Sequence, residues 1–578
     1  MRKILLKSLR EYKREAILAP FFVILEVFLE VLIPFMMTKI IDVGIMEKNL
    51  PYVLRLGLIL VLMAIASLIF GVAAGRTAAI AGAGYGKNLR HDIFYKVQDF
   101  SFQNIDHYSS SGLVTRMTTD TTNIQMAFMM TIRILTRTPI MMILSLFMAI
   151  NINKNIASLF LVGVILLAGG LGIIVKVVHP YFRKVFQSYD TLNQVVQENV
   201  RGARVVKAYV REDYEIDKFK DVSSLVYRLY TTAQKIVAWN GPLMQFTMYL
   251  VILAIFLIGG KAIAYGNMKI GELTAIMVYA MQILISLMMV TFVFVLNIIS
   301  SASADRIEEI LREEPSLANP KHPKGDVKQG DIQFDHVNFR YKNEGKKYIL
   351  NDINFSIHEG ETIGIIGGTG SGKSTLVQLI PRLYDVTEGR ILVGGIDVRD
   401  YDLTTLRDKV AMVLQKNTLF TGTIKDNIRW GNQEATDEEV QEVCKLAKAH
   451  DFIKEFPKGY DTTITQGGTN VSGGQKQRLC IARALLKKPK ILILDDSMSA
   501  VDTKTESEIR HGLMNHLPNT TKIIISQRIS SIEDADRIIV IHEGRIHGFG
   551  TSQELLKTNH IYREIYETQL EGGDRLEG

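Results

Sequence analysis

Cysteine is scarce in this chain. Only two cysteines occur among 578 residues, Cys444 and Cys480. Two cysteines at that spacing form neither a disulfide framework nor a metal-binding pattern. Both lie in the C-terminal half, for which a reduced cytosolic environment is the consistent setting.

The sequence also lacks the pattern of a cleavable signal peptide, so we expect that its first residues are not cleaved. The first fourteen residues, MRKILLKSLREYKR, are rich in Lys and Arg, but the apolar run after them is too long for a signal peptide and no small-residue cleavage site follows. This basic start explains part of the net charge of +7. Its place before an apolar run fits the positive-inside rule, although a solvated basic helix is the alternative. We therefore predict membrane lipid and no nucleic acid among the partners.

Long apolar runs dominate residues 1 to about 310. The chain is 47% hydrophobic with a mean hydropathy of +0.13, too apolar for an ordinary soluble enzyme. A bilayer core needs about 20 apolar residues per helix, and a helix satisfies its own backbone in lipid. The candidate membrane helices are residues 16–40, 53–80, 128–150, 156–178, 243–265 and 272–299.

The connections between these candidate spans are uneven. Three are short and contain few Lys or Arg, around Asn49, Asn153 and Asn267. Two others, after the second and fourth spans, run for roughly 50 to 65 residues. Their periodic apolar residues, as in LRHDIFYKVQDFSFQNI, indicate helices rather than disordered loops. With a cytosolic N-terminus, we expect both long segments to be membrane helices that continue into the cytosol and turn there.

Four charged residues fall within or beside the predicted spans. Glu26 and Glu30 lie one turn apart on the first span, as do Arg133 and Arg137 on the third. Such charges usually face the bundle interior or water. Two interpretations stay open here, selection of amphipathic cations in a cavity and internal ion pairing. Methionine suits adaptable apolar binding surfaces but is also ordinary core filler, so the substrate stays open among drugs, lipids and peptides.

The composition changes near residue 311. The stretch LREEPSLANPKHPKGDVKQG has three prolines and many charges, which is typical of a linker. After it, short apolar runs such as ETIGIIGG, KILILDD, TKIIISQ and RIIVIHEG alternate with helical patterns, which predicts an α/β domain with buried strands. We therefore predict a helical transmembrane domain over 1–312, a linker over 313–330 and an α/β domain over 331–578.

One motif assigns chemistry to the α/β domain. The stretch GGTGSGKST matches the phosphate-binding pattern G-x-x-x-x-G-K-[ST] between a strand-like run and a helical one. Backbone N–H groups of such a loop face phosphate at a helix N-terminus. Lys373 would reach the terminal phosphates of ATP, and Ser374 would ligate Mg²⁺ together with Asp495, which ends a later apolar strand. The predicted phosphate-binding residues are Gly367, Gly368, Thr369, Gly370, Ser371, Gly372, Lys373, Ser374 and Thr375.

The order of further motifs resembles an ABC transporter. Tyr341, GGTGSGKST, Gln415, VSGGQ, ILILDD and SAVD follow one another as in its nucleotide-binding domain, over about 331–570. The helical half, with FQNIDHYSSSGLVTRMTTD, resembles an ABC exporter transmembrane domain. The resemblance implies that Tyr341 stacks on adenine, and that Gln415 contacts Mg²⁺ and transmits the nucleotide state to the membrane helices.

The resemblance also implies a dimer. One chain carries one membrane half and one nucleotide-binding domain, so a second half-transporter chain is the implied partner. The SAVD residues, Ser499 to Asp502, would lie at the interface between the two nucleotide-binding domains. The signature residues would act on the γ-phosphate held by the opposite subunit, namely Ser472, Gly473, Gly474 and Gln475.

Three positions depart from the family pattern. Asp496 replaces the expected Glu, Gln527 replaces the expected His, and TQGGTN (465–470) lacks a Glu-Arg pair. The Asp496 carboxylate would sit about 1.5 Å short, and a misplacement of about 1 Å can reduce a rate roughly 10²-fold. Gln527 can hydrogen-bond phosphate but cannot carry a charge or a proton. Both changes weaken the chemistry and leave ATP binding intact.

We interpret this chain as the degenerate-site half of a heterodimeric exporter. Lys373, Asp496 and Gln527 are its candidate catalytic residues, and its intact signature would complete the partner's site. We expect a multi-pass protein of the cytoplasmic membrane, with the nucleotide-binding domain and both termini cytosolic, that transports a small molecule. The alternatives are a homodimeric lipid or peptide exporter and an ATP-gated protein that transports nothing, although long regulatory insertions are lacking.

Overall fold

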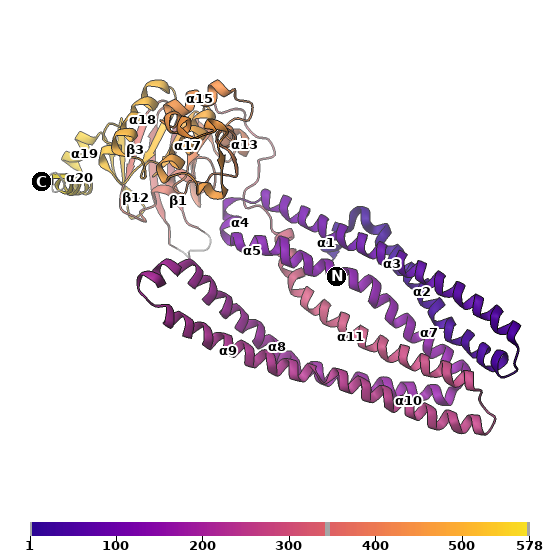
Figure 1. The fold of residues 1–578 in the computed structure, drawn as a ribbon. Helices are drawn as coiled ribbons and strands as arrows, with labels where there is room; N and C mark the ends of the chain where they lie inside the picture. Colours follow the sequence, from indigo (N-terminus) through magenta and orange to yellow (C-terminus); the bar gives the residue numbers. More distant parts are fainter. Residues whose placement is uncertain (1–2, 342–346, 575–578) are drawn as a thin grey trace. The chain divides into compact units, whose positions relative to one another are not determined.

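The computed structural model describes residues 3–341 and 347–574, which form two compact units (Figure 1). The first contains residues 3–98 and 110–313, and the second contains residues 99–109 and 314–574. A short segment from the first half of the chain therefore belongs with the C-terminal unit.

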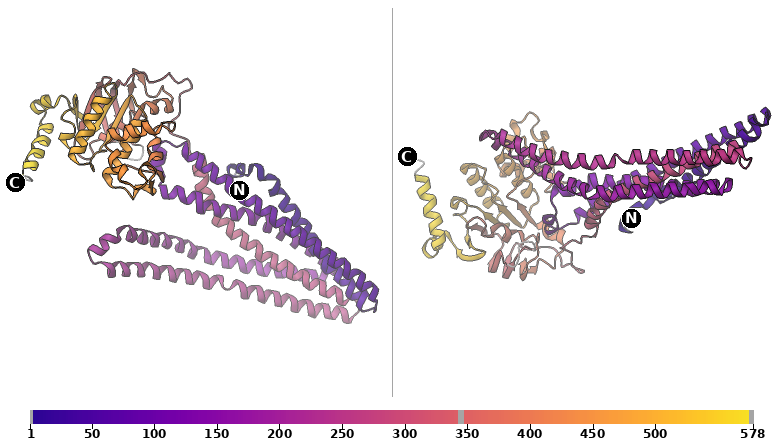
Figure 2. Two further views of the ribbon diagram at one scale, coloured as in Figure 1. Left: turned by 45° about the horizontal axis from the view of Figure 1, so that its top comes forward. Right: turned by 90° about the horizontal axis from the view of Figure 1, so that it is seen from below.

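The described part of the first unit is built from helices (Figure 2). In chain order they are α1 (Lys3–Leu6), η1 (Lys7–Tyr12), α2 (Lys13–Lys39), η2 (Ile40–Ile45), α3 (Leu50–Gln98), α5 (Ser110–Thr115), η3 (Arg116–Asp120), α6 (Thr121–Met130), η4 (Thr131–Leu135), α7 (Thr136–Ile152), α8 (Lys154–Ala208), α9 (Glu212–Val237), α10 (Asn240–Ala264) and α11 (Ile270–Arg312).

Within residues 3–341 and 347–574, six helical segments are long and apolar enough to cross a membrane, and each overlaps one predicted span. Many of their large apolar side chains are exposed, which would be energetically unfavourable in water. In the most apolar window of α3, no residue is buried inside the protein, and Leu54, Leu58 and Leu62 are all more than half exposed. A helix that is apolar on every side is stable where lipid covers its outer surface.

The long connections are helical, as predicted. Helix α3 has 49 residues and α8 has 55, so at 1.5 Å per residue both extend for about 70 to 80 Å. A bilayer hydrocarbon core is only about 30 Å thick. Both helices therefore project far beyond a membrane, and the side on which they do so stays a prediction.

Wide helical turns bring polar residues to the boundary with α11. The π-helical turn η3 ends at Asp120, which is buried and accepts hydrogen bonds from Ser303 Oγ at 2.8 Å and Arg306 Nε at 2.7 Å. A further π-helical turn, η4, begins at Thr131, whose hydroxyl accepts from Asn297 Nδ2 at 3.0 Å. These turns aim polar side chains at one neighbouring helix, a frequent use of π-helical geometry.

The second unit is an α/β domain, as predicted, with a six-stranded sheet in the order β12-β11-β3-β10-β9-β6 and a four-stranded antiparallel sheet β2-β1-β4-β5. Strands β3, β10 and β9 pair in parallel at its centre and are buried throughout, which explains their unbroken apolar runs. The strands are β1 (Ile332–Phe339), β2 (Leu350–Ile357), β3 (Thr362–Ile366), β4 (Glu388–Val393), β5 (Ile396–Asp397), β6 (Val410–Val413), β7 (Gly422–Thr423), β8 (Thr463–Ile464), β9 (Ile491–Asp495), β10 (Thr521–Ile525), β11 (Arg537–His542) and β12 (Arg545–Gly550).

Helices cover the sheets of this unit. They are α4 (Phe102–His107), α12 (Lys373–Gln378), α13 (Leu403–Lys409), α14 (Ile424–Arg429), α15 (Asp437–Leu446), α16 (His450–Glu455), η5 (Gly459–Asp461), η6 (Gln466–Gly468), α17 (Gly473–Leu486), α18 (Thr503–His516), η7 (Ile529–Ser531), α19 (Ser552–Thr558) and α20 (His560–Asp574). Cys444 on α15 and Cys480 on α17 are free and buried, and burial raises the pKa of Cys444 to about 12. Its thiol is therefore protonated and unreactive at neutral pH.

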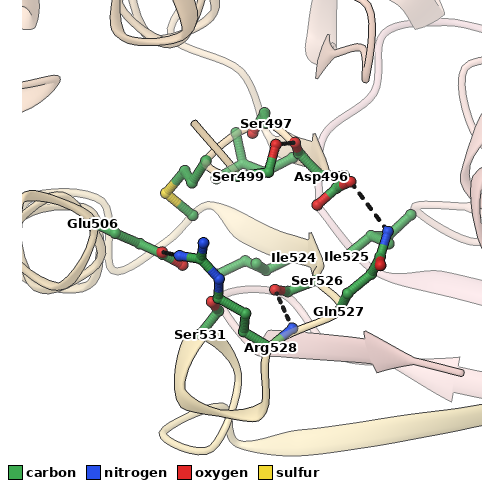
Figure 3. A pocket seen from close by; sticks show the side chains of 12 residues that line it. Asp496, Ser497, Ser499, Glu506, Ile524, Ile525, Ser526, Gln527, Arg528 and Ser531 are labelled. Carbon is green, nitrogen blue, oxygen red and sulfur yellow. Dashed lines mark hydrogen bonds and ion pairs between the residues drawn. The ribbon is translucent and has the colours of Figure 1, made fainter. Parts of the chain in front are cut away.

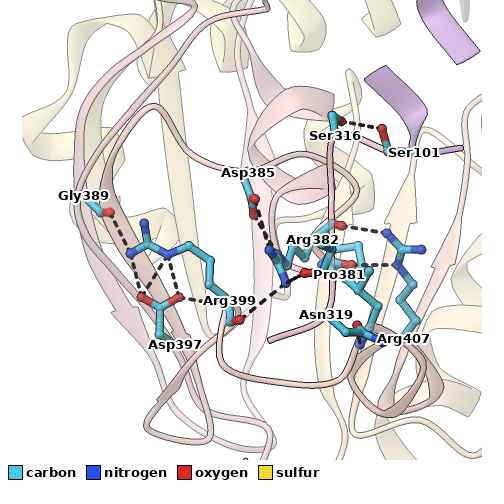
Figure 4. A network of polar contacts seen from close by, with 12 residues as sticks. Ser101, Ser316, Asn319, Pro381, Arg382, Asp385, Gly389, Asp397, Arg399 and Arg407 are labelled. Atoms are coloured by element: carbon cyan, nitrogen blue, oxygen red, sulfur yellow. Dashed lines mark hydrogen bonds and ion pairs between the residues drawn. The ribbon is translucent and has the colours of Figure 1, made fainter. Parts of the chain in front are cut away.

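Residues 99–109 are hydrogen-bonded to the rest of the second unit. Ser101 Oγ bonds to Ser316 Oγ (Figure 4), and Asn104 Nδ2 donates to the carbonyl of Glu314 at 3.1 Å. A neighbouring network is built on arginines, of which Arg382 binds Asp385 and receives, at its own carbonyl, a hydrogen bond from Arg407 at 2.8 Å. These bonds fix the turn after α12.

Candidate functional site

The phosphate-binding motif forms a tight loop between β3 and α12. A Cβ on Gly367 would lie 2.0 Å from the carbonyl oxygen of Ile541, so only glycine fits there. Gly372 has φ +99° and precedes the first turn of α12. Glycine adopts this left-handed conformation without steric cost, which lets the loop curl around the helix N-terminus. Phosphate binds in this way in other loops of this pattern.

Three side chains of the predicted site converge beside this loop. Lys373 Nζ donates to the carbonyls of Gly367 and Gly368, both at 2.8 Å, and Ser374 Oγ donates to Asp495 Oδ1 at 2.9 Å. Burial lowers the pKa of Lys373, against the pull of Asp496 and Asp495. Burial raises the pKa of Asp495. Bound phosphate would stabilise the lysine's positive charge, and a cation would stabilise the negative charge of Asp495.

Asp496 follows β9 in an unusual backbone conformation. Its φ is +46°, a left-handed conformation that Asp tolerates better than most residues. Its Oδ2 accepts long hydrogen bonds from two amides, Gln415 Nε2 at 3.5 Å and Gln527 Nε2 at 3.4 Å. Figure 3 shows the Gln527 side chain directed at this carboxylate. Asp496 is thus held between two neutral donors that cannot take a proton from it.

A cavity of about 480 Å³ brings most of the predicted residues together. It is lined by residues 369–375, Gln415, Asp495, Asp496 and Gln527, with Ile349 and Ile525. Among the residues that the structure describes, neither the signature residues nor Tyr341 belongs to this lining. A nucleotide in the cavity therefore lacks a signature from its own chain.

The signature residues form the N-terminus of helix α17. Ser472 caps α17, because its Oγ accepts from Gln475 N at 3.2 Å while Gln475 Oε1 accepts from Ser472 N at 2.9 Å. This reciprocal capping box leaves the helix N-terminus able to attract an anion. A Cβ on Gly474 would lie 2.7 Å from the carbonyl oxygen of Ala500, whereas one on Gly473 would be 3.4 Å from the Ala500 side chain. Gly474 therefore packs against the chain's own SAVD segment.

The neutral TQGGTN segment is held by its own hydrogen bonds. Asn470 Nδ2 donates to the carbonyl of Thr463 at 2.9 Å, and Asn470 Oδ1 accepts from Thr465 Oγ1 at 3.0 Å. Lys476 Nζ on α17 donates to the carbonyl of Gly467 at 2.7 Å. Although the segment lacks the Glu-Arg pair, hydrogen bonds within the loop and from α17 hold it in place.

Tyr341 lies beside a different cavity, of about 710 Å³. Its ring packs edge-on against Tyr384, with centroids 5.1 Å apart, and its hydroxyl lies 3.2 Å from Thr375 Oγ1. The Tyr384 hydroxyl donates to Asp106 Oδ2 on α4 at 2.6 Å, and Phe102 of α4 packs edge-on against the same ring. The predicted adenine-stacking residue is therefore one ring away from residues 99–109.

The site also contains an unsatisfied polar atom that suits phosphate. Ser371 Oγ, in the phosphate loop, is buried without a hydrogen-bond partner among the described residues. Together with the ammonium of Lys373, it fits an incoming anion. Ser374 Oγ and Asp495 supply the oxygen ligands that Mg²⁺ prefers, and this ion needs few protein ligands because it keeps several waters and phosphate oxygens.

In the first unit, three of the four charged residues singled out from the sequence form ion pairs with one another. Arg137 Nη1 donates to Glu26 Oε1 at 2.6 Å, and Arg137 Nη2 donates to Glu30 Oε2 at 2.6 Å. Small residues make room for this cluster, since a Cβ on Gly71 would lie 3.0 Å from Glu26 Oε1. Of the two interpretations of Glu26 and Glu30, the contacts favour internal pairing over selection of cations.

Comparison with known proteins agrees with both halves of the chain. Residues 16–288 match the family of the ABC transporter transmembrane region, and residues 350–499 match the ABC transporter family of ATPase domains. The chain is 35% identical over 571 residues to the uncharacterized ABC transporter ATP-binding protein YfiB of Bacillus subtilis (strain 168), with 98% of each chain covered. The chain belongs to the ABC transporter family.

This ABC half-transporter has further relatives. It is 37% identical over 396 residues to the probable multidrug resistance ABC transporter ATP-binding/permease protein YheI of the same organism, covering 68% of this chain and 67% of that protein. A bacterial Atm1-family ABC exporter with ATP bound has the same fold, with a TM-score of 0.84, 24% identity, and 97% of this chain and 99% of that one covered. The protein is thus a multi-pass membrane protein with a fused ABC-type ATPase, and half-transporters of this kind dimerise.

The half-transporter also contains site residues that sequence reasoning missed. Gln477 joins the signature helix to the SAVD segment, because its Oε1 accepts from Ala500 N at 2.9 Å and its Nε2 donates to Ser499 Oγ at 3.3 Å. Its place two residues after VSGGQ was the available signal. Tyr384 packs on Tyr341 and Gln569 bonds to Gln527, so both also adjoin the site. Neither residue belongs to a recognised motif, so the sequence carries no signal for them.

Proposed function

We propose that this half-transporter exports apolar or amphipathic small molecules as one half of a heterodimer. Its own ATP site would be slow, and its signature would complete a fast site on the partner's phosphate loop. The observation that carries the proposal is the surrounding of Asp496. The short carboxylate accepts hydrogen bonds from two glutamine amides, and the described residues that line the cavity include neither His nor Glu, while the ATP-binding residues are retained.

The chemistry of the site supports slow hydrolysis. ATP hydrolysis needs an attacking water that is oriented and deprotonated, and a positioned general base is worth about 10²–10⁴ in rate. Asp496 would have to act over an additional distance of about 1.5 Å, the length of one methylene. Gln527 can donate a hydrogen bond to a phosphate oxygen, which favours retention of the nucleotide over its turnover.

The signature supports the complementary role. Its helix start is intact, and it does not line the cavity beside the chain's own phosphate loop among the described residues. A second chain therefore has to supply the signature for this loop, and this chain's signature is available to that second chain. The positive end of α17 and the Ser472 hydroxyl are suited to a γ-phosphate.

The remaining assignments follow from the same proposal. Mg²⁺ would be held by Ser374, Asp495 and Gln415, where it would neutralise phosphate charge. The transmembrane domain would span 1–312, the linker 313–330 and the nucleotide-binding domain 331–578. The nucleotide-binding domain and both termini would lie on the cytosolic side of the cytoplasmic membrane. The naming of YheI as a probable multidrug resistance transporter, together with the apolar spans, supports a multidrug-type substrate.

Steady-state ATPase of the purified complex tests the proposal. The complex is isolated through a tag on this chain, and a second, similar chain should co-purify. Asp496→Ala should leave ATPase within about tenfold of wild type, because a working base would be worth about 10²–10⁴. Ser472→Ala with Gly473→Asp should abolish most activity, since an acid then faces the partner's γ-phosphate. Gly473 is chosen over Gly474 because a Cβ at Gly474 would lie 2.7 Å from the carbonyl oxygen of Ala500.

Lys373→Ala should fall between these variants, because it weakens ATP retention at the slow site. If Asp496→Ala and the signature double variant reduce ATPase equally, Asp496 is a true base and a homodimer suffices. Export itself is measured as ATP-dependent uptake of a fluorescent amphipathic compound into inverted vesicles. ATP-gated leakage in both directions would instead indicate a channel.

A further inference from the structure

The C-terminal helix α20 contacts the loop that carries Gln527. Gln569 Nε2 donates to the carbonyl oxygen of Gln527 at 2.7 Å, and Gln569 Oε1 accepts from the backbone N–H of Ile529 at 2.9 Å. One side chain thus holds backbone groups on both sides of Arg528. Two good hydrogen bonds from one planar amide fix the orientation of the intervening peptides.

Helix α20 is itself firmly attached at its start. Asn559 precedes the helix, and its side chain accepts from Tyr562 N at 2.9 Å while donating to the carbonyl of His547 at 2.9 Å. Tyr562 is fully buried, and Ile565 and Tyr566 pack on the core that contains Ile529. Residues at this spacing share one face of a helix, so Gln569 lies one turn beyond the apolar anchor and on the same side.

Besides the bond from Gln527 to Asp496, two further contacts of the Gln527 loop involve Arg528. Arg528 pairs with the buried Glu506 of α18 at 3.7 Å, and its backbone N–H donates to Ser526 Oγ at 3.0 Å (Figure 3). These contacts border a polar cavity of about 210 Å³ behind Asp496. The backbone carbonyl of Gln527 is instead bound by α20.

We propose that Gln569 is a positioning residue for Gln527 and that α20 thereby controls how long the nucleotide is retained. The direction of the Gln527 side-chain amide depends on the orientation of the Gln527 backbone. In the structure, Gln527 Nε2 lies 3.4 Å from Asp496 Oδ2. Without Gln569, the Gln527 backbone can rotate and the amide leaves the phosphate side of the cavity. A partner that displaces α20 would then act on nucleotide retention from outside the site. The inference goes beyond the proposed function, because it holds whether the site is slow or fast.

Two variants of Gln569 separate its two hydrogen bonds, and a third variant on the same helix is the control. Gln569→Met has similar length and helix propensity but loses both bonds, whereas Gln569→Glu keeps the acceptor for Ile529 and loses the donor to Gln527. Glu567→Met, at an exposed site on the same helix, is the matched control. The readout is the slow phase of dissociation of N-methylanthraniloyl-ATP with Mg²⁺ from the purified complex. We expect Gln569→Met to speed dissociation about three- to tenfold, because both hydrogen bonds that hold the Gln527 backbone are lost, and the control to match wild type.

A Gln527→Ala background decides whether Gln569 acts through Gln527. There the effect of Gln569→Met on dissociation should disappear, while the melting temperature stays within about 2 °C in all variants. An unchanged dissociation rate in Gln569→Met, or an equal acceleration with and without Gln527, would overturn the inference. The Asp496→Ala experiment is independent of this one, so failure of the slow-site proposal is distinguishable from failure of this inference.

Discussion

Restoring the two missing groups should restore hydrolysis at this chain's own site. The perturbation is Asp496→Glu with Gln527→His, made in a background of Ser472→Ala and Gly473→Asp that silences the partner's site. A positioned base is worth about 10²–10⁴ in rate, which corresponds to roughly 2.7 to 5.4 kcal/mol of barrier at 1.36 kcal/mol per tenfold. The longer Glu side chain regains about 1.5 Å toward the cavity of about 480 Å³.

The structure also sets a cost for this change. Residue 496 has φ +46°, where Glu is less favourable than Asp by about 1 kcal/mol, so the gain should be at the lower part of the range. Because about 1 kcal/mol lowers a 10²-fold gain about fivefold, we expect ATPase to rise at least about 20-fold over the silenced background, and Asp496→Glu alone to give a smaller rise. The assay is phosphate release at saturating ATP, with nucleotide binding measured in parallel. A rise below threefold with normal binding would refute the argument that positions 496 and 527 limit this site.

Three further predictions concern other parts of the chain. Arg137→Met should lower the free energy of unfolding by roughly 2 to 4 kcal/mol, because Glu26 and Glu30 lose their cation, and replacing both acids by Gln in this variant should recover most of that loss. Thermal unfolding in detergent measures the change, and an unchanged melting temperature would contradict the prediction. Tyr384→Phe should keep basal ATPase within twofold but reduce its stimulation by transported compounds, because the hydrogen bond to Asp106 is lost; full stimulation would argue against the contact. An impermeant thiol reagent should label intact cells at single cysteines in or beside the short connections, and labelling only after permeabilisation would reverse the topology. The positions, chosen because they are exposed and spare the helix caps, are Glu47, Asn155 and Asn267.

Much of the architecture could be predicted because its signals are local. A run of about 20 apolar residues is a membrane helix wherever it occurs, since lipid leaves the backbone no other partner. The phosphate loop was equally readable, because the glycines at 367 and 372 meet steric demands that the sequence pattern itself records. The strands β3, β9 and β10 were recognisable since burial on both faces of a parallel sheet requires unbroken apolar residues.

Other features depend on which residues the folded chain brings together. The sequence left cation binding and ion pairing equally open for Glu26 and Glu30, and the packing of α2 against α7 placed Arg137 between them. Tyr384 meets Asp106 across 278 positions of sequence, and Gln569 meets Gln527 across 42. The sequence by itself determined a membrane half, an ATPase half and an altered pair of residues in the ATP site. Only the tertiary structure decided which polar side chains hold that pair in place, because a hydrogen bond depends on distance and direction in space, and neither is encoded by residue type.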